Sequence, residues 1–226
     1  MRSDYAPVTT GLLGNGGPHR FGWFARRWQI LLGAAVAAIV ITVGLAVGLR
    51  RKSETPQPAL SAIAILNNGS VTGTVAFSQT EGSSLVLVTV SLQGVPVSNG
   101  WSPGANHGLH IHNSSDLSNS CLSAGPHFNP TRAAHGGRDA AVRHAGDLGN
   151  VTADAGGVVR ASFSVAGLSL RSTDAGYIIG RSVMLHADAD DGGLLNFTDS
   201  LTTGHAGARI ACGAIVAPLA GGREGR

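Results

Sequence analysis

Apolar and polar residues alternate along the chain from Ala59 onward. Val71, Val75 and Phe77 stand at every second position or a multiple of it, with Gly73 in the same series, and polar residues fill most of the intervening positions. The same period recurs in Val86-Leu-Val-Thr-Val-Ser-Leu92 and in Val159-Arg-Ala-Ser-Phe-Ser-Val165. Short runs of this kind, separated by Gly, Asn and Asp clusters, predict antiparallel strands closed into a sandwich or barrel.

A different pattern precedes this region. Residues Ile30–Leu49 carry no charge over twenty positions, and arginines and a lysine flank them at 26–27 and 50–52. This length fits a single transmembrane helix, while the alternative of a cleaved signal peptide usually has a shorter apolar core nearer the N-terminus. The chain therefore divides into an N-terminal tail (1–29), an anchor (30–49), a linker (50–58), a domain (59–220) and a C-terminal tail (221–226).

The charge is distributed unevenly between these parts. The chain has a formal net charge of +3, but residues 1–58 hold seven basic against two acidic residues, and residues 59–220 hold seven arginines against ten acidic residues. The large domain is therefore mildly acidic, which disfavours nucleic acid as a partner. The 33 glycines follow no collagen period, and two cysteines are too few for a disulfide-stapled miniprotein.

Features of the domain favour an extracytoplasmic location. Four N-glycosylation sequons begin at Asn68, Asn113, Asn150 and Asn196. Each is weak evidence by itself, and the two cysteines also suit an oxidising compartment. We expect a type II single-pass membrane protein with a cytosolic N-terminus and an extracellular or lumenal domain.

Histidine carries the candidate chemistry, because eight of the nine histidines lie between His107 and His205. His110 and His112 would project from one face of a strand, and with His127 and His186 they would form a four-nitrogen set suited to Cu(II). His135, His144 and Asp147 follow in a glycine-rich stretch, and three imidazoles with one carboxylate can close a tetrahedral zinc site. The residues alone leave open a polar loop with incidental histidines.

Several motifs carry a family resemblance. They are His107-Gly-Leu-His-Ile-His112, Cys121-Leu-Ser-Ala-Gly-Pro-His-Phe-Asn-Pro130, His135-Gly-Gly, Arg143-His-Ala-Gly-Asp-Leu-Gly-Asn-Val-Thr-Ala-Asp154, Ile179-Gly-Arg181, His186-Ala-Asp-Ala-Asp-Asp191 and Gly204-His-Ala-Gly-Ala-Arg-Ile-Ala-Cys-Gly213. In this order and spacing, the domain resembles copper/zinc superoxide dismutase. The resemblance implies an all-β, eight-stranded Greek-key barrel, here preceded by the single transmembrane helix.

The resemblance also implies a role for each site residue. Copper would be held by His110, His112, His127 and His186, and zinc by His127, His135, His144 and Asp147, so that His127 bridges the two metals. Asp190 would link a copper ligand to a zinc ligand, Cys121 and Cys212 would form a disulfide, and Arg209 would dock superoxide. Copper would cycle between two oxidation states while His127 takes and returns a proton, converting superoxide to O2 and hydrogen peroxide.

Three departures from the family pattern limit these expectations. The stretch Val95–Asn106 is longer than the usual connection. Residues 192–203 contain no lysine, so long-range guidance of superoxide is in doubt. Asn113-Ser-Ser-Asp116 replaces a segment that contributes to the dimer contact in many members; a homodimer is expected from the resemblance alone.

Two other functions compete with the enzyme. A copper-delivery or noncatalytic copper-binding protein could reuse the barrel, but family-related copper chaperones carry a separate Cys-x-x-Cys domain, which this chain lacks. An adhesion or interaction module could use the metals only as a scaffold, and Arg209 argues against that interpretation.

Overall fold

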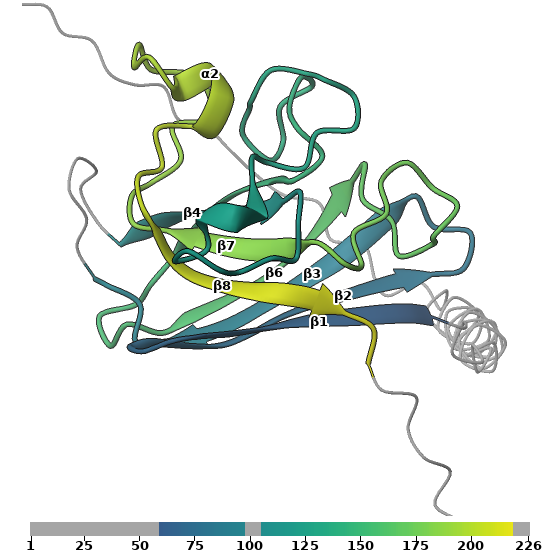
Figure 1. Ribbon diagram of the computed structural model, residues 1–226, viewed down its shortest axis with the longest axis horizontal. Helices are drawn as coiled ribbons and strands as arrows, with labels where there is room; N and C mark the ends of the chain where they lie inside the picture. The colour runs from purple at the N-terminus through teal and green to yellow at the C-terminus, as the bar shows by residue number, and fades with distance from the viewer. Residues whose placement is uncertain (1–58, 98–104, 219–226) are drawn as a thin grey trace, which may run out of the picture. The chain divides into compact units, whose positions relative to one another are not determined.

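The computed structural model describes residues 59–97 and 105–218, which form one β-rich domain (Figure 1). Within these residues the only helical segments are two short turns, η1 (Leu122–Ala124) and α2 (Ser200–Thr203). The strands are β1 (Ala59–Asn68), β2 (Val71–Thr80), β3 (Leu85–Gln93), β4 (Asn106–His112), β5 (Asp147–Thr152), β6 (Val159–Ala166), β7 (Ser182–His186) and β8 (Arg209–Val216).

The predicted alternation corresponds to strands that bury one face. In β3, Val86, Val88, Val90 and Leu92 are buried and every residue between them is exposed. The inward side chains join one hydrophobic cluster with residues of the other strands, among them Phe77 of β2. Fully burying a side chain of this size stabilises the fold by about 1.5–3 kcal/mol, so the register of each strand is strongly specified.

The strands form one eight-stranded sheet in the order β5-β4-β7-β8-β1-β2-β3-β6. The chain passes between the β1-β2-β3-β6 half and the β4-β5-β7-β8 half three times, after β3, after β5 and after β6. The halves join through a short β1–β8 pairing at Ile63 and Ala64, and the end strands β5 and β6 also contact each other. The sheet is therefore a nearly closed barrel, as expected from the sequence.

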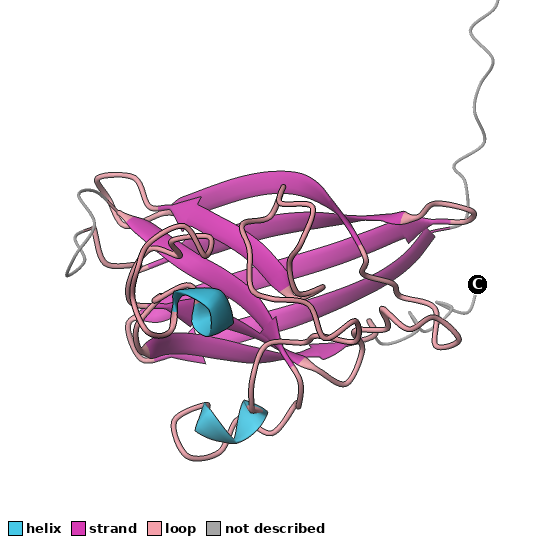
Figure 2. Cartoon of the chain, turned by 90° about the horizontal axis from the view of Figure 1, so that it is seen from above, coloured by secondary structure: helices cyan, strands magenta, loops and turns pink. Residues whose placement is uncertain are grey.

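Long connections position the candidate site. Figure 2 shows the strands in crossing layers, with loops and one helical turn in front of them and the other helical turn below them. Residues 113–146 connect β4 to β5, and residues 187–208 connect β7 to β8. The disulfide between Cys121 and Cys212 is present and fastens the first of these loops to β8, confirming the predicted pairing.

Some predictions fall outside the described residues. These are the tail 1–29, the anchor 30–49, the linker 50–58 and the C-terminal tail 221–226. No helix within residues 59–97 and 105–218 has the length and apolar character needed to cross a bilayer.

Candidate metal centre

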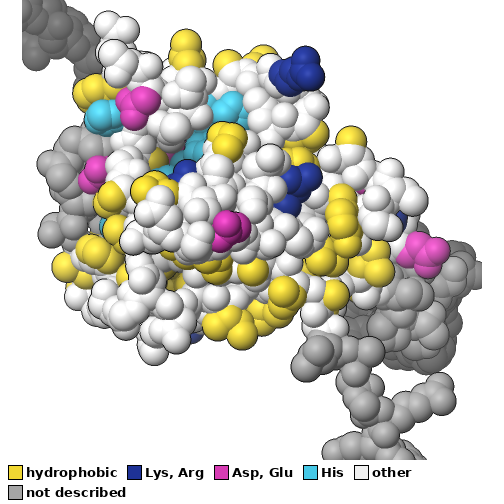
Figure 3. Space-filling model, viewed as in Figure 1, with side chains coloured by type: hydrophobic (Ala, Val, Ile, Leu, Met, Phe, Trp, Pro, Cys, Tyr) yellow, Lys and Arg dark blue, Asp and Glu magenta, His cyan; other side chains and the backbone are white. Residues whose placement is uncertain are grey.

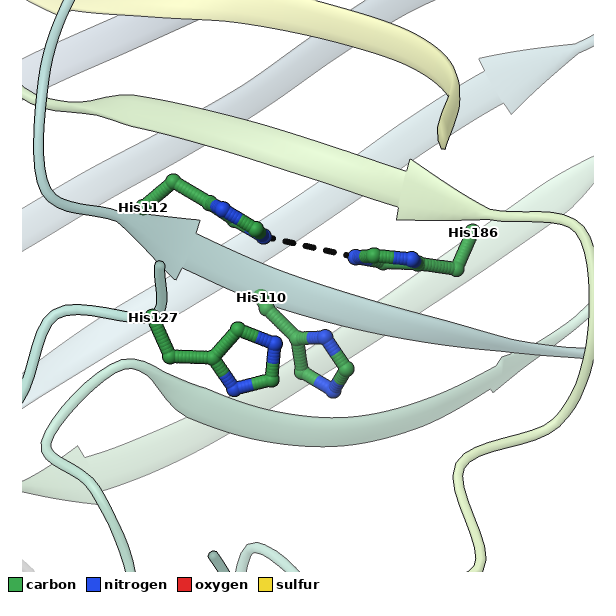
Figure 4. Close-up of side chains that lie close together, drawn as sticks. All are labelled: His110, His112, His127 and His186. Carbon is green, nitrogen blue, oxygen red and sulfur yellow. Dashed lines mark hydrogen bonds between the residues drawn. The ribbon is translucent and has the colours of Figure 1, made fainter. Parts of the chain in front are cut away.

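Four histidines from two strands and a loop converge at one point of the barrel wall. His110 and His112 lie two residues apart on β4, His186 ends the neighbouring strand β7, and His127 follows η1 in the loop and pairs with His112 in an isolated β-bridge. All four are buried, and one nitrogen from each lies within 4.8 Å of the others. Figure 4 shows the four rings turned toward a common space.

Hydrogen bonds determine which nitrogen of each ring faces this space. His112 Nδ1 donates to Gly125 O at 2.7 Å, and His186 Nδ1 lies 3.2 Å from Gly207 O. Their Nε2 atoms therefore face each other at 3.4 Å, along the dashed line in Figure 4. His110 Nδ1 and His127 Nε2 are buried without a hydrogen-bond partner. Because buried polar atoms are normally paired, four converging imidazole nitrogens fit a copper ion.

A second set lies on the other side of His127. The Nδ1 atoms of His127, His135 and His144 lie 2.9, 3.1 and 3.2 Å from one oxygen, Asp147 Oδ1. Asp147 Oδ2 accepts hydrogen bonds from the backbone N–H groups of His144 and Gly136, which fixes the carboxylate. Three imidazoles and one oriented carboxylate fit the donor set of zinc.

The two sets are coupled in two places. His127 belongs to both, with Nδ1 directed to Asp147 and Nε2 toward the four-histidine set. Asp190 links the two sets through the ring nitrogens that face away from them. Its Oδ2 lies 2.9 Å from His110 Nε2, and its Oδ1 lies 2.8 Å from His135 Nε2. A carboxylate in this position fixes the orientation of one ring in each set.

Burial lowers the pKa of three rings of the four-histidine set. Burial and the neighbouring His127 ring lower the pKa of His112 to about 2, and burial and His110 lower the pKa of His127 to about 3. The pKa of His186 also lies well below its usual value, mainly because of burial. These rings are neutral at physiological pH, which leaves nitrogen lone pairs available to a metal.

The second set has the opposite electrostatics. Burial opposes the charge on His135, but hydrogen bonds to Asp147 and Asp190 outweigh burial and raise its pKa to about 9. Burial also opposes the charge on Asp147, yet its hydrogen bonds to three imidazoles, that of His127 foremost, keep its pKa well below the usual value. A positive charge is therefore favoured at this point, as zinc would supply.

Arg209 lies at the first position of β8, beside the four-histidine set. Its Nη1 donates to Cys121 O at 2.5 Å and to Leu122 O at 3.2 Å, and its Nη2 donates to Gly125 O at 2.6 Å. Gly125 O also accepts from His112, so one carbonyl connects the guanidinium to a ring of the set. The side chain is half-buried, and burial lowers its pKa. In the space-filling view, histidine atoms are visible in a hollow with a cationic side chain beside them (Figure 3).

Sequence reasoning missed three supporting residues. His107 is fully buried, and its ring nitrogens lie 2.9 Å from His186 O and 2.8 Å from Pro96 O. Asn150 donates to Asp190 O and accepts from Asp190 N, both at 2.7 Å. Gly204 has a φ of +68°, and a Cβ there would clash with Asp190 Oδ1. Each lies within a quoted motif, but only long-range contacts reveal its role.

The connection after Asp191 presents apolar side chains to solvent. Leu194 is 87% exposed and Leu201 61% exposed, and Leu195 and Phe197 are exposed as well. His205 stacks on Phe197 at a centroid distance of 3.7 Å, and its Nδ1 lies 2.7 Å from Asp199 Oδ1. Residues 192–203 contain no lysine or arginine, so this connection presents apolar rather than cationic side chains to solvent.

Comparisons with known proteins agree with this geometry. The family model described as copper/zinc superoxide dismutase matches residues 71–215. The chain is 46% identical over 155 residues to the Cu-Zn superoxide dismutase of Schizosaccharomyces pombe, covering 68% of this chain and 96% of that protein. It is 39% identical over 183 residues to the extracellular Cu-Zn superoxide dismutase of Drosophila melanogaster, covering 78% of this chain and 96% of that protein.

A solved structure shows the same likeness. The crystal structure of the clock protein EA4 has a TM-score of 0.63 and 39% sequence identity, covering 70% of this chain and 94% of that chain. The chain therefore belongs to the copper/zinc superoxide dismutase family, and like that family it is an oxidoreductase that uses copper and zinc.

Proposed function

We propose that this chain dismutates superoxide to O2 and hydrogen peroxide at a paired copper and zinc site on the extracytoplasmic side of a membrane. The observation that carries the proposal is the sharing of His127 between two buried donor sets of different composition. His110, His112, His127 and His186 would hold copper, and His127, His135, His144 and Asp147 would hold zinc. When bound, copper supplies the one-electron redox couple, and zinc supplies a fixed charge.

The residues around the metals each have a task. Arg209 attracts and docks the superoxide anion, because its guanidinium is held beside the set by three carbonyls. His127 would hold a proton at Nε2 in one half of the cycle and give it up to the peroxide product in the other, while solvent would supply the second proton of hydrogen peroxide. Asp190 keeps His110 and His135 oriented throughout.

The location rests on different observations. The apolar segment 30–49 is long enough to span a bilayer, four sequons follow it, and both cysteines are oxidised. A relative covering 78% of the chain is named an extracellular superoxide dismutase. We infer a type II anchor with the barrel in the extracellular space or a lumen. Protease added to sealed microsomes, whose outer face is the cytosolic one, tests this topology. The barrel should be protected there and should lose protection in detergent.

The experiment that tests the catalytic assignment compares two ligand substitutions. His186→Ala removes a ligand of the copper set only, and His144→Ala removes a ligand of the zinc set only. We expect His186→Ala to lose copper and dismutation while keeping zinc, and His144→Ala to lose zinc first. Metal content per chain and dismutation rate are measured on the purified full chain.

Two outcomes would contradict the proposal. Unchanged activity of His186→Ala would refute the copper assignment. A wild-type chain with one copper and one zinc bound but no dismutation would favour a noncatalytic copper-binding protein. Sedimentation of the same sample tests the further expectation of a homodimer.

A further inference from the structure

The four sequons stand in very different surroundings, although their sequence signals are alike. N-glycosylation replaces one N–H of the asparagine amide with a bulky sugar, so the folded domain must leave room at Nδ2. All four asparagines lie in described residues, and their hydrogen bonds can therefore be compared directly.

Asn150 cannot carry a sugar in the folded site. Its Nδ2 and Oδ1 bond to the backbone O and N of a single residue, Asp190, so both bonds leave the amide on the same side. The N–H that donates to Asp190 O therefore points in the direction of Oδ1. In an N-substituted amide the trans preference places the substituent on that same side. A sugar on Asn150 would replace the bond that holds Asp190 against His110 and His135.

Asn68 and Asn113 are also held by the fold. Asn68 Nδ2 donates to Ile210 O at 2.7 Å. Asn113 Oδ1 accepts from Arg181 Nη1 at 2.7 Å, and the same guanidinium covers the ring of Phe128 at 3.6 Å. A sugar attached at either position would lie next to an amide that is already hydrogen-bonded to the fold.

Asn196 differs from the other three. It is exposed on the connection between β7 and α2, and its side-chain amide forms no hydrogen bond with the described residues. Leu195 and Phe197 on either side are exposed, as are Leu194 and Leu201 nearby. Exposed apolar side chains on both sides of one asparagine are unfavourable in water, and a covalently attached carbohydrate would shield them.

We propose that Asn196 carries an N-linked glycan and that Asn150 does not. The inference rests on the proposed extracytoplasmic location, because the donor, a lipid-linked oligosaccharide pyrophosphate, is used there. In the transfer, a bond forms between Asn196 Nδ2 and the anomeric carbon, the bond from that carbon to the pyrophosphate oxygen breaks, and Nδ2 loses one proton. The lipid pyrophosphate leaves with the bonding electron pair. Thr198 completes the sequon and is itself exposed.

The test uses the full chain expressed in a eukaryotic cell with a secretory pathway. Enzymatic release of N-glycans in H2 18O converts each glycosylated asparagine to a labelled aspartate, and peptide mass spectrometry reads all four sites separately. Label is expected at Asn196 and absent from Asn150 in the dismutase-active fraction. Thr198→Ala, which removes the sequon but keeps Asn196, should abolish the label at Asn196. Thr198→Ser, which keeps the sequon, should retain that label.

Protease protection, measured on sealed microsomes from the same cells, distinguishes failure of this inference from failure of the proposed location. A protected barrel with unlabelled Asn196 overturns this inference and leaves the location intact. A barrel exposed to the cytosol with no label at any site overturns both. Label at Asn150 in active, metal-loaded protein overturns the exclusion drawn from its pairing with Asp190.

Discussion

The carboxylate of Asp190 provides the sharpest test of how the two metal sets are coupled. Asp190→Asn keeps the size of the side chain but replaces one acceptor oxygen with an N–H donor group. That group must face either His110 Nε2 or His135 Nε2, which lie 2.9 and 2.8 Å from the two carboxylate oxygens. One ring therefore loses its partner, whichever way the amide turns.

The magnitude follows from the lost bond. A hydrogen bond to a charged group contributes about 1.5–3 kcal/mol. Independently, loss of a residue that orients metal ligands typically costs about 10–100-fold in metal affinity, or about 1.4–2.7 kcal/mol. The two estimates agree, so we expect the affinity for at least one metal to fall by about 10–100-fold.

The assay is competition with a chromophoric chelator, carried out for copper and zinc in turn on the purified chain. Asp139→Asn is the matched control, since this carboxylate lies in the same long connection as His135 and is 91% exposed. The control should bind both metals as the wild type does. If folded Asp190→Asn kept wild-type affinity for both metals, the inferred coupling through Asp190 would be refuted.

Other substitutions probe the surroundings of the site. Arg209→Ala is predicted to slow dismutation by about tenfold or more and to flatten its dependence on ionic strength. Arg209→Lys should preserve the salt dependence but not the full rate, because one ammonium nitrogen cannot take the places of the two guanidinium nitrogens that donate to three carbonyls. Pulse radiolysis across salt concentrations checks both, and a wild-type profile for the alanine variant would assign Arg209 a purely structural role. Replacing Cys121 and Cys212 together by serine opens a loop of 91 positions and should lower the free energy of unfolding by about 4–5 kcal/mol in the chain-entropy model. Urea denaturation measures this loss, and unchanged stability would contradict that model for this disulfide. Gly204→Ala should weaken zinc binding by about tenfold or more, because a Cβ there would displace the Asp190 carboxylate and lie 2.5 Å from His135 Nε2. Gly82→Ala is the control, because Gly82 has a similar positive φ but open space around it, and should cost only the backbone strain of about 1–2 kcal/mol. Equal effects of the two changes on zinc affinity would show that the clash is unimportant.

The fold was predictable because its main signal is local. Side chains alternate between the two faces of a strand, so the apolar residues at every second position in Val86–Leu92 indicate both the strand and its buried face. The same alternation places His110 and His112 on one side of β4. The family motifs then supplied the number of strands and the disulfide, which spacing alone could not provide.

The site is only partly predictable, because its supporting contacts join residues distant in the chain. Asn150 carries a sequon in the sequence, but in the structure its amide is bonded to Asp190, forty positions away. His107 likewise supports the backbone of His186 across 79 positions. Hydrogen bonds of this kind have no sequence period, so no pattern could indicate them.

The sequence by itself determined the strands, the supply of histidines and the membership of the family, because these depend on residue type and short spacing. The tertiary structure decided which ring nitrogen faces each metal set, through the partners of His112, His110 and His135. It also decided that one imidazole, His127, lies between both sets. These outcomes required closure of the barrel, because only then do donors from β4, β7 and the long connections come within bonding distance of one another.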